Sequence, residues 1–215
     1  MSVVAGVDAC RSGWVAVVAE DGRVSGSRVA PRFTDLLAAL PEAVAIGVDI
    51  PIGLPAAGPR AADIEARAFV GPRRNSVFPT PSRAALSAAT YAEARLVLPS
   101  LSAQSFALGK KILEVEDALE ERVFEVHPEV SFRELAGRHL QYSKRSWNGQ
   151  MERRRLLADA GLVLQDEIDA GDVPVDDVLD ATVAAWSAAR KALGQAETLP
   201  ATPPVQDGRA VAIWY

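Results

Sequence analysis

Short strand-like runs fill the first fifty residues, and they constrain the fold more than any other feature of the chain. Runs rich in β-branched residues occupy positions 2–7, 13–19 and 23–29. Asp21-Gly22, between the second run and the third, is typical of a tight hairpin, so the three runs are expected to form an antiparallel meander. A helix is expected over 34–40. The run at 43–50 is apolar on both faces, which indicates a central strand of a sheet covered on both sides.

The rest of the chain predicts helices packed on this sheet. Residues 51–102 are punctuated by Pro and Gly but are too apolar for a linker, so we expect a folded insertion that caps one face. Helices are expected over 61–70, 89–96, 103–121, 129–136, 147–160 and 175–193, and strands over 123–127 and 210–215. This order predicts one α/β domain over residues 1–215, with a mixed five-stranded sheet flanked by helices and a helical and loop insertion after the fourth strand.

Composition limits the kinds of site that the chain can carry. The 215 residues include 23 Lys and Arg against 28 Asp and Glu, which argues against nonspecific coating of nucleic acid. Cys10 is the only cysteine and there are 2 histidines, which excludes a cysteine zinc cluster and a multi-histidine site. A metal would be held by carboxylates, which favours Mg²⁺ or Mn²⁺. Neither a signal peptide nor an apolar run of about 20 residues is found, so we expect a cytoplasmic protein with no membrane partner.

Four aspartates stand where a sheet and a late helix can bring them together. Asp8 ends the first strand and Asp49 ends the fourth, so both lie at one end of the sheet if these strands are neighbours. Asp177 and Asp180 share a face of the last helix, between a large apolar stripe and a stripe of alanines, and point inward if both stripes pack. The alternatives are a turn aspartate for Asp8, an Asx turn for Asp49, and favourable helix N-terminal charges for the acidic stretch 166–180.

This acidic stretch changes the meaning of the net charge of −5. It holds seven acidic residues and no basic one, whereas the rest of the chain has 23 basic residues against 21 acidic ones. The negative charge is therefore concentrated around a candidate metal site, and the composition permits an enzyme that acts on nucleic acid.

Carboxylates from two strand ends and a late helix can hold two divalent cations, about 3.5–4 Å apart, that stabilise the attacking and leaving oxygens of a phosphodiester. The pattern supports a ribonuclease-H-like architecture, which opens with three antiparallel strands, a helix and a fourth strand. The carboxylate pair on the last helix is most similar to the resolvase branch of that fold. Asp8, Asp49, Asp177 and Asp180 match these roles by position.

Several segments, taken together and in order, resemble one family of unknown function. They are Gly6-Val7-Asp8 with Gly13-Trp14, residues 49–55, residues 74–81 with Arg83, and residues 104–106, 111–115, 125–132 and 177–181. Over about residues 3–190 the chain resembles domain of unknown function 429 (DUF429), a family regarded as predicted nucleases of ribonuclease-H-like fold. The resemblance implies that fold and, because the nuclease label is itself inferred from the fold, a nuclease hypothesis.

The segment VFEVHPE at 123–129 adds three candidates. Glu125, His127 and Glu129 alternate onto one face of a strand, so all three can approach one site. His127 would serve as a proton shuttle and Glu129 as an extra ligand. The alternative is a histidine hydrogen-bonded at a strand end beside two exposed glutamates. The family resemblance favours catalytic roles.

Residues expected to bind substrate lie in the insertion and in the segment before the helix at 147–160. They are Arg74, Ser76, Arg83, Lys144 and Arg145. The run Arg153-Arg154-Arg155 is expected to form a solvated helix face instead.

The leading hypothesis is a divalent-metal-dependent nuclease whose partner is nucleic acid. Asp8, Asp49 and Asp180 are the expected principal ligands of two Mg²⁺ or Mn²⁺ ions, with Asp177 as a supporting ligand. An actin-like nucleotide-handling protein and a non-catalytic binding module on the same fold are the alternatives. The chain has no P-loop, dinucleotide-binding or nucleophile-elbow motif. The sequence does not determine the oligomeric state of the protein, and a homodimer is one of the states it permits.

Overall fold

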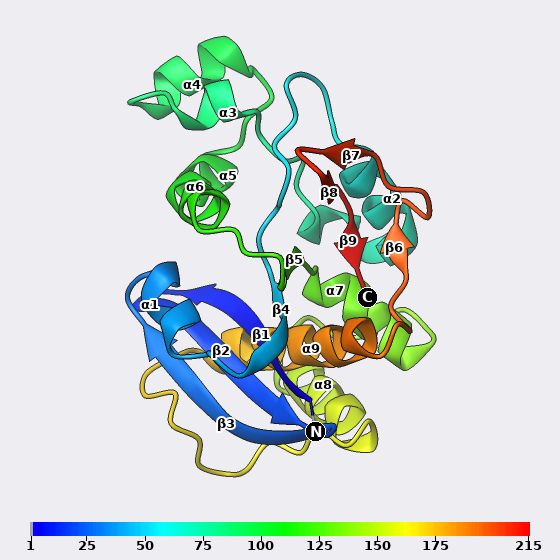
Figure 1. The fold of residues 1–215 in the computed structure, drawn as a ribbon. Coiled ribbons are helices and arrows are strands. Elements are labelled where there is room, and N and C mark those ends of the chain that lie inside the picture. The colour runs from blue at the N-terminus through cyan, green and yellow to red at the C-terminus, as the bar shows by residue number, and fades with distance from the viewer. Residues whose placement is uncertain (1) are drawn as a thin grey trace.

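The structure is a computed structural model that describes residues 2–215, and a five-stranded sheet forms its centre (Figure 1). The strands are β1 (Val3–Cys10), β2 (Gly13–Glu20), β3 (Arg23–Ala30), β4 (Ala43–Val48) and β5 (Val123–Glu125), in the spatial order β3-β2-β1-β4-β5. Strands β1, β2 and β3 pair antiparallel, whereas β4 runs parallel to both β1 and β5. This mixed sheet flanked by helices confirms the predicted α/β class and is consistent with a ribonuclease-H-like fold.

The hairpin predicted at Asp21-Gly22 is present between β2 and β3. Asp21 and Gly22 both have positive φ, 49° and 78°, which is the backbone shape of a two-residue hairpin turn that matches strand twist. At the start of β2, the fully buried Trp14 packs against Phe33, with ring centroids 5.0 Å apart. Phe33 opens helix α1 (Phe33–Ala38), so the short helix expected over 34–40 covers the meander.

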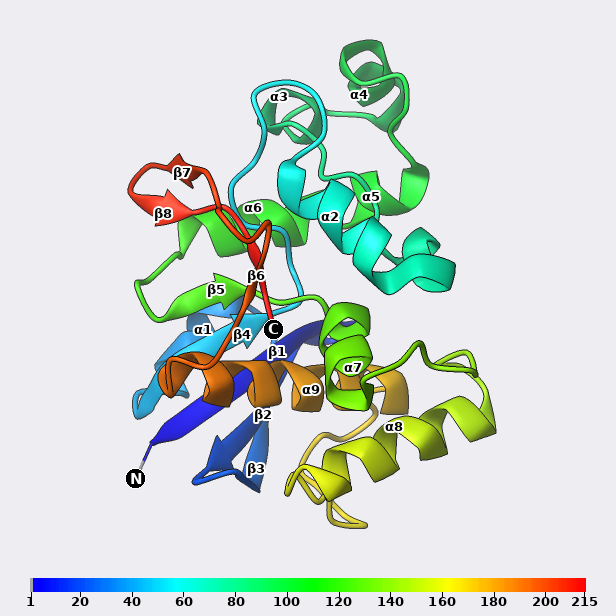
Figure 2. The ribbon, with the colours of Figure 1, turned by 90° about the vertical axis from the view of Figure 1, so that its right-hand side faces the viewer.

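Helices cover both faces of the sheet. One face packs on α9 (Val175–Ala192), with α7 (Pro128–Ala136) and α8 (Trp147–Asp159) beyond it, as Figure 2 shows. The opposite face packs on α1 and on α6 (Gly109–Asp117). None of the helices within residues 2–215 combines the length and the apolar character that a membrane crossing requires.

Helix α9 lies directly against the backbone of the central strands. A Cβ atom added at Gly6 of β1 would lie only 2.0 Å from the carbonyl oxygen of Ala181 and 2.0 Å from the amide nitrogen of Ala185. Gly47 of β4 is also tight, because its Cβ would lie 2.9 Å from the carbonyl oxygen of Ala184. Glycine is therefore needed at both positions for this close approach.

The connection from β4 to β5 forms a cap. It contains α2 (Ala61–Val70), the 3₁₀ helix η1 (Gly71–Ser76), α3 (Arg83–Leu86), α4 (Tyr91–Val97), α5 (Ala103–Ala107) and α6. Helices α3 and α4 lie at its top in Figure 1, away from the sheet.

The prediction of a single helix over 103–121 is wrong, because the helix is interrupted at Leu108, between α5 and α6. Gly109 begins the second helix against Leu86 of α3, where a Cβ would approach the Leu86 Cδ2 atom to 2.9 Å. Packing of α3 against this junction and the low helix propensity of glycine account for the break.

The last residues form two small ribbons instead of the one strand expected over 210–215. Strands β6 (Thr198–Leu199) and β9 (Ile213–Trp214) pair antiparallel, as do β7 (Val205–Gln206) and β8 (Arg209–Ala210). A single parallel bridge joins Trp214 to Val126, so the first ribbon lies beside the β5 edge of the sheet.

Candidate metal centre

The fold brings three of the predicted aspartates together. Val7 and Val48 are partners in the parallel pairing of β1 with β4, so Asp8 and Asp49 follow at the same end of the sheet. Each aspartate stands two residues after a glycine that contacts α9, in the tripeptide Gly-Val-Asp at 6–8 and again at 47–49. Because strand residues two apart share a face, both carboxylates point to the α9 side, where Asp180 lies.

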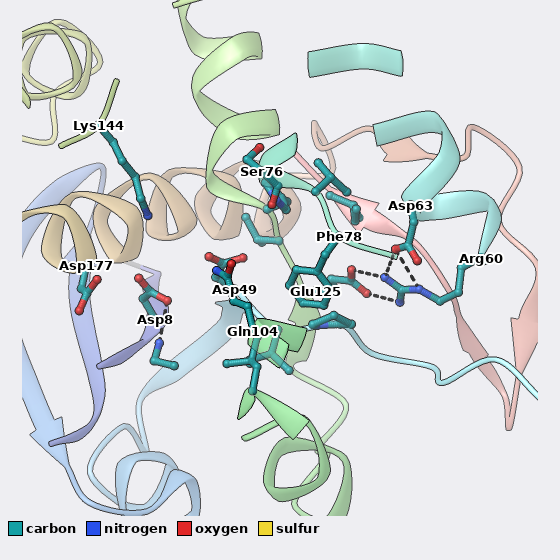
Figure 3. Close-up of a pocket in the computed structure, with 18 residues that line it drawn as sticks. Asp8, Asp49, Arg60, Asp63, Ser76, Phe78, Gln104, Glu125, Lys144 and Asp177 are labelled. Atoms are coloured by element: carbon teal, nitrogen blue, oxygen red, sulfur yellow. Dashed lines mark hydrogen bonds and ion pairs between the residues drawn. The ribbon is translucent and has the colours of Figure 1, made fainter. Parts of the chain in front are cut away.

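The three carboxylates are close; Asp8 and Asp180 are buried, and Asp49 is half-buried. One oxygen from each of Asp8, Asp49 and Asp180 lies within 4.8 Å of the others. Asp8 is 7% exposed and Asp180 is 2% exposed. Figure 3 shows Asp8 and Asp49 facing the pocket with Asp177 beside them. We call Asp8, Asp49 and Asp180 the carboxylate cluster.

Burial and mutual repulsion disfavour charge in the carboxylate cluster. Burial, followed by the nearby charges of Asp49, Asp180 and Asp177, raises the pKa of Asp8 well above its ordinary value. Burial raises the pKa of Asp49 to about 7 and that of Asp180 to about 6, with Lys144 opposing both shifts. A bound cation would remove this cost. An all-oxygen, all-carboxylate donor set of this kind could hold a hard divalent ion.

Lys144 is the basic group inside this site. Its Nζ atom donates a hydrogen bond to Asp180 Oδ2 at 2.5 Å, and its side chain is 35% exposed. Burial alone would lower the pKa of Lys144, but the carboxylates of Asp180, Asp49 and Asp8 outweigh burial and raise it. The lysine was expected to contact substrate; in the structure it also neutralises part of the carboxylate cluster.

Asp177 lies one turn before Asp180 and is less enclosed. It lines the pocket of about 260 Å³ that also contains Asp8, Asp49 and Lys144. Burial, followed by the charge of Asp176, raises the pKa of Asp177 to about 6. Its carboxylate is not among the three that converge within 4.8 Å, which suits the predicted supporting role.

The raised pKa values predict an unusual pH dependence of stability. In a chelator, the free energy of unfolding is expected to fall as the pH rises from about 4 to about 7, because folded Asp49 keeps a proton that unfolded Asp49 releases. His127 gives the opposite trend, since burial lowers its pKa. The measurement is therefore the difference between wild type and Asp49→Asn in urea unfolding across this range. A difference that does not change with pH would contradict the prediction, and Mg²⁺ should restore stability above pH 7.

Glu125 takes part in a buried ion network at the far side of the same pocket (Figure 3). Its two oxygens accept hydrogen bonds from Arg60 Nη1 and Nη2, both at 2.7 Å, and Oε2 also accepts from the Ile52 amide at 2.8 Å. Arg60 in turn donates to Asp63, whose Oδ2 accepts from the Thr80 amide at 2.8 Å. The network ties α2 of the cap to β5. Arg60 and Asp63 carried no signal in the sequence, because nothing local marks either as buried.

These contacts predict a structural role for Glu125. Glu125→Gln is expected to lower the free energy of unfolding by about 2 kcal/mol or more, because it weakens charged hydrogen bonds to the buried Arg60. Mn²⁺ affinity should stay within about threefold of wild type, since the change leaves the carboxylate cluster intact. Glu121→Gln, at an exposed position, is the matched control. Loss of Mn²⁺ binding with unchanged stability would instead support the catalytic role predicted from the sequence.

His127 lines the first pocket and, with Glu129, borders a second pocket of about 360 Å³. The two pockets share Asp49, Ser76, His127 and Lys144. His127 Nε2 lies 3.3 Å from the carbonyl oxygen of Ser76. Glu129 pairs with Arg153, so the two glutamates and the histidine do not converge on one point. The roles predicted for His127 and Glu129 stay predictions.

Arg153 corrects the expectation of a solvated arginine face. Its side chain is fully buried, and it donates to Glu129 and to the carbonyl oxygens of Tyr142 and Gly149. Arg154 is largely exposed and pairs with Asp166. One member of the run is thus a buried anchor for the segment that carries Lys144.

The other predicted substrate residues divide into two groups. Ser76 and Lys144 line both pockets, together with cap residues such as Phe78 and Gln104 in the first. Arg74, Arg83 and Arg145 line neither pocket, although Arg74 and Arg145 are next in the chain to residues that do. Arg83 pairs with Glu116.

Comparison with known proteins identifies a family. A family model described as "Protein of unknown function (DUF429)" matches residues 6–205. Comparisons with curated proteins and with solved structures both gave no match.

Proposed function

The chain belongs to the DUF429 family, and we propose that it is a divalent-metal-dependent nuclease that hydrolyses phosphodiester bonds of nucleic acid. The observation that carries the proposal is the buried carboxylate cluster at the end of a ribonuclease-H-like sheet, facing a pocket. Burial and mutual repulsion make these charges costly to the fold, and Lys144 balances only part of them.

In this proposal the chain's own residues have distinct tasks. Asp8, Asp49 and Asp180 hold two Mg²⁺ or Mn²⁺ ions, with Asp177 in support. When bound, such ions supply Lewis acidity for the phosphoryl oxygens and for the attacking water. Lys144 and Ser76, which line both pockets, bind the phosphate oxygens of the substrate.

Flanking residues would extend the grip on the nucleic acid. Arg74 lies in η1 with Ser76, and Arg145 follows Lys144 directly. Arg83 begins α3 of the cap. Contacts of these arginines to phosphates beyond the scissile bond would fix the register of the strand without reading its sequence.

The test is incubation of the purified protein with single-stranded, duplex, hybrid and branched nucleic acids in Mg²⁺ or Mn²⁺, and in a chelator as control. ATP is added as a separate substrate. Metal-dependent cleavage of one nucleic acid class supports the proposal. Hydrolysis of ATP without cleavage would favour the actin-like alternative, and metal binding without any hydrolysis would favour a binding module.

A further inference from the structure

Lys144 stands at the boundary between the carboxylate cluster and the open pockets. Its ammonium contacts Asp180, whose side chain is 3% exposed, yet about a third of the lysine side chain reaches solvent. In Figure 3 the side chain extends from outside the pocket toward Asp8 and Asp49. Within the described residues 2–215, Lys144 is the only lysine or arginine that lines both pockets adjoining the carboxylate cluster, and His127 lines both as well.

The backbone that carries Lys144 is fixed on both sides. Buried Arg153 donates to the Tyr142 carbonyl oxygen at 3.3 Å, two residues before the lysine. Ser146 Oγ donates to the Ser143 carbonyl oxygen at 2.8 Å and accepts from the Gly149 amide at 3.1 Å. A Cβ at Gly149 would lie 1.9 Å from that same Ser143 oxygen. The segment is therefore packed onto α8. The backbone of Lys144 is held in place, and its flexible side chain is the part that can move.

Lys144 and a divalent ion would use the same carboxylates. Three ionised carboxylates are neutralised by one ammonium and one divalent ion, whereas a second divalent ion leaves a surplus of positive charge. Asp180 would then bind an ion rather than the ammonium, and like charges would drive the ammonium away from the carboxylate cluster. The nearest open space is the pockets that Lys144 already lines, where a substrate phosphate would supply a new counter-charge.

We propose that Lys144 is a positioning residue that couples ion loading to phosphate binding. Its ammonium neutralises the carboxylate cluster, leaves Asp180 when the divalent ions bind, and then holds the substrate phosphate in the pocket. The proposal rests on the metal site put forward above, and it adds that the lysine competes with the ions instead of helping to bind them.

The test compares Mn²⁺ binding by wild type and Lys144→Met, measured by electron paramagnetic resonance of free Mn²⁺. The variant keeps an unbranched side chain, one atom shorter, and removes its charge, so Mn²⁺ should bind about 10-fold more tightly. In saturating Ca²⁺, a short oligonucleotide should bind the variant about 10-fold more weakly. Lys144→Arg, which keeps the charge, should resemble wild type in both measurements. Lys110→Met, at an exposed position of α6, is the control for loss of one positive charge.

Each outcome has one meaning. Tighter Mn²⁺ binding combined with weaker oligonucleotide binding supports the coupling. Equal or weaker Mn²⁺ binding by Lys144→Met overturns it and leaves the metal site standing. Absence of Mn²⁺ binding by every variant, wild type included, removes the metal site and the coupling together. Thermal unfolding of Lys144→Met in Mn²⁺ verifies that the variant is folded.

Discussion

Asp180→Asn is expected to lower the rate of metal-dependent phosphodiester cleavage by more than about 100-fold, because loss of residues that merely support metal ligands already costs 10- to 100-fold. The substitution keeps the shape of a 2% exposed side chain but removes one of the three converging carboxylates. Stability should change little, since the substitution removes repulsion with Asp8 and Asp49 but also removes the ion pair with Lys144. The measurements are cleavage rates at saturating Mn²⁺ and urea unfolding of the same preparations.

Asp172→Asn is the matched control for this loss of charge. Asp172 belongs to the same acidic stretch but is exposed, and it borders neither pocket beside the carboxylate cluster. The Asp172→Asn variant should cleave the nucleic acid at the wild-type rate. Equal rates for wild type, Asp172→Asn and Asp180→Asn would show that any cleavage does not depend on the carboxylate cluster, and the proposed site would then be abandoned.

Gly6→Ala is expected to destabilise the protein by about 4 kcal/mol, more than the roughly 1–3 kcal/mol typical of core overpacking, because the clash is with helix backbone. The added methyl group would lie 2.0 Å from backbone atoms of Ala181 and Ala185, and a helix backbone cannot yield as a flexible side chain does. Relief requires α9 to move off β1, which also carries Asp180 away from Asp8. Urea unfolding should therefore show the loss of stability, and Mn²⁺ titration should show weaker binding.

Gly26→Ala provides the comparison for glycine replacement in a strand. At Gly26 of β3 the nearest atom to an added Cβ is Arg28 Nη1, at 3.5 Å, and that side chain can move. This variant should be as stable as wild type or slightly more stable, because alanine loses less backbone entropy on folding. If the free energies of unfolding of Gly6→Ala and Gly26→Ala differ by less than about 1 kcal/mol, the close approach of α9 to β1 does not hold Asp180 in place beside Asp8.

The sequence predicts the parts of this fold that local pattern determines. The β-branched runs and the Asp21-Gly22 turn specify β1 to β3, and the doubly apolar run at 43–50 specifies β4. The carboxylates of Asp8 and Asp49 were predicted to meet because both end neighbouring strands. The repeated Gly-Val-Asp tripeptide is a second signal for the same pair, since each glycine marks contact with α9.

The remaining features depend on partners far away in the chain. The break between α5 and α6 follows from packing on α3, more than twenty residues earlier. Arg153 can be buried because it forms an ion pair with Glu129, 24 residues away in the chain. Arg60 can be buried because it forms an ion pair with Glu125, 65 residues away. Periodicity within a helix carries no information about such pairs, so a run of arginines looks solvated until its partner is known.

The path of the cap has an evolutionary consequence. The whole cap lies between β4 and β5, which are neighbouring parallel strands, so it adds no strand between them and interrupts no pairing. Insertions or deletions around α3 and α4, the part of the cap away from the sheet, can therefore accumulate without moving Asp8, Asp49 or Asp180, provided that the Arg60–Glu125 junction and the packing of α6 on the sheet are kept. In the proposed nuclease, diversification of one continuous stretch would change the targets while the proposed metal ligands are inherited unchanged.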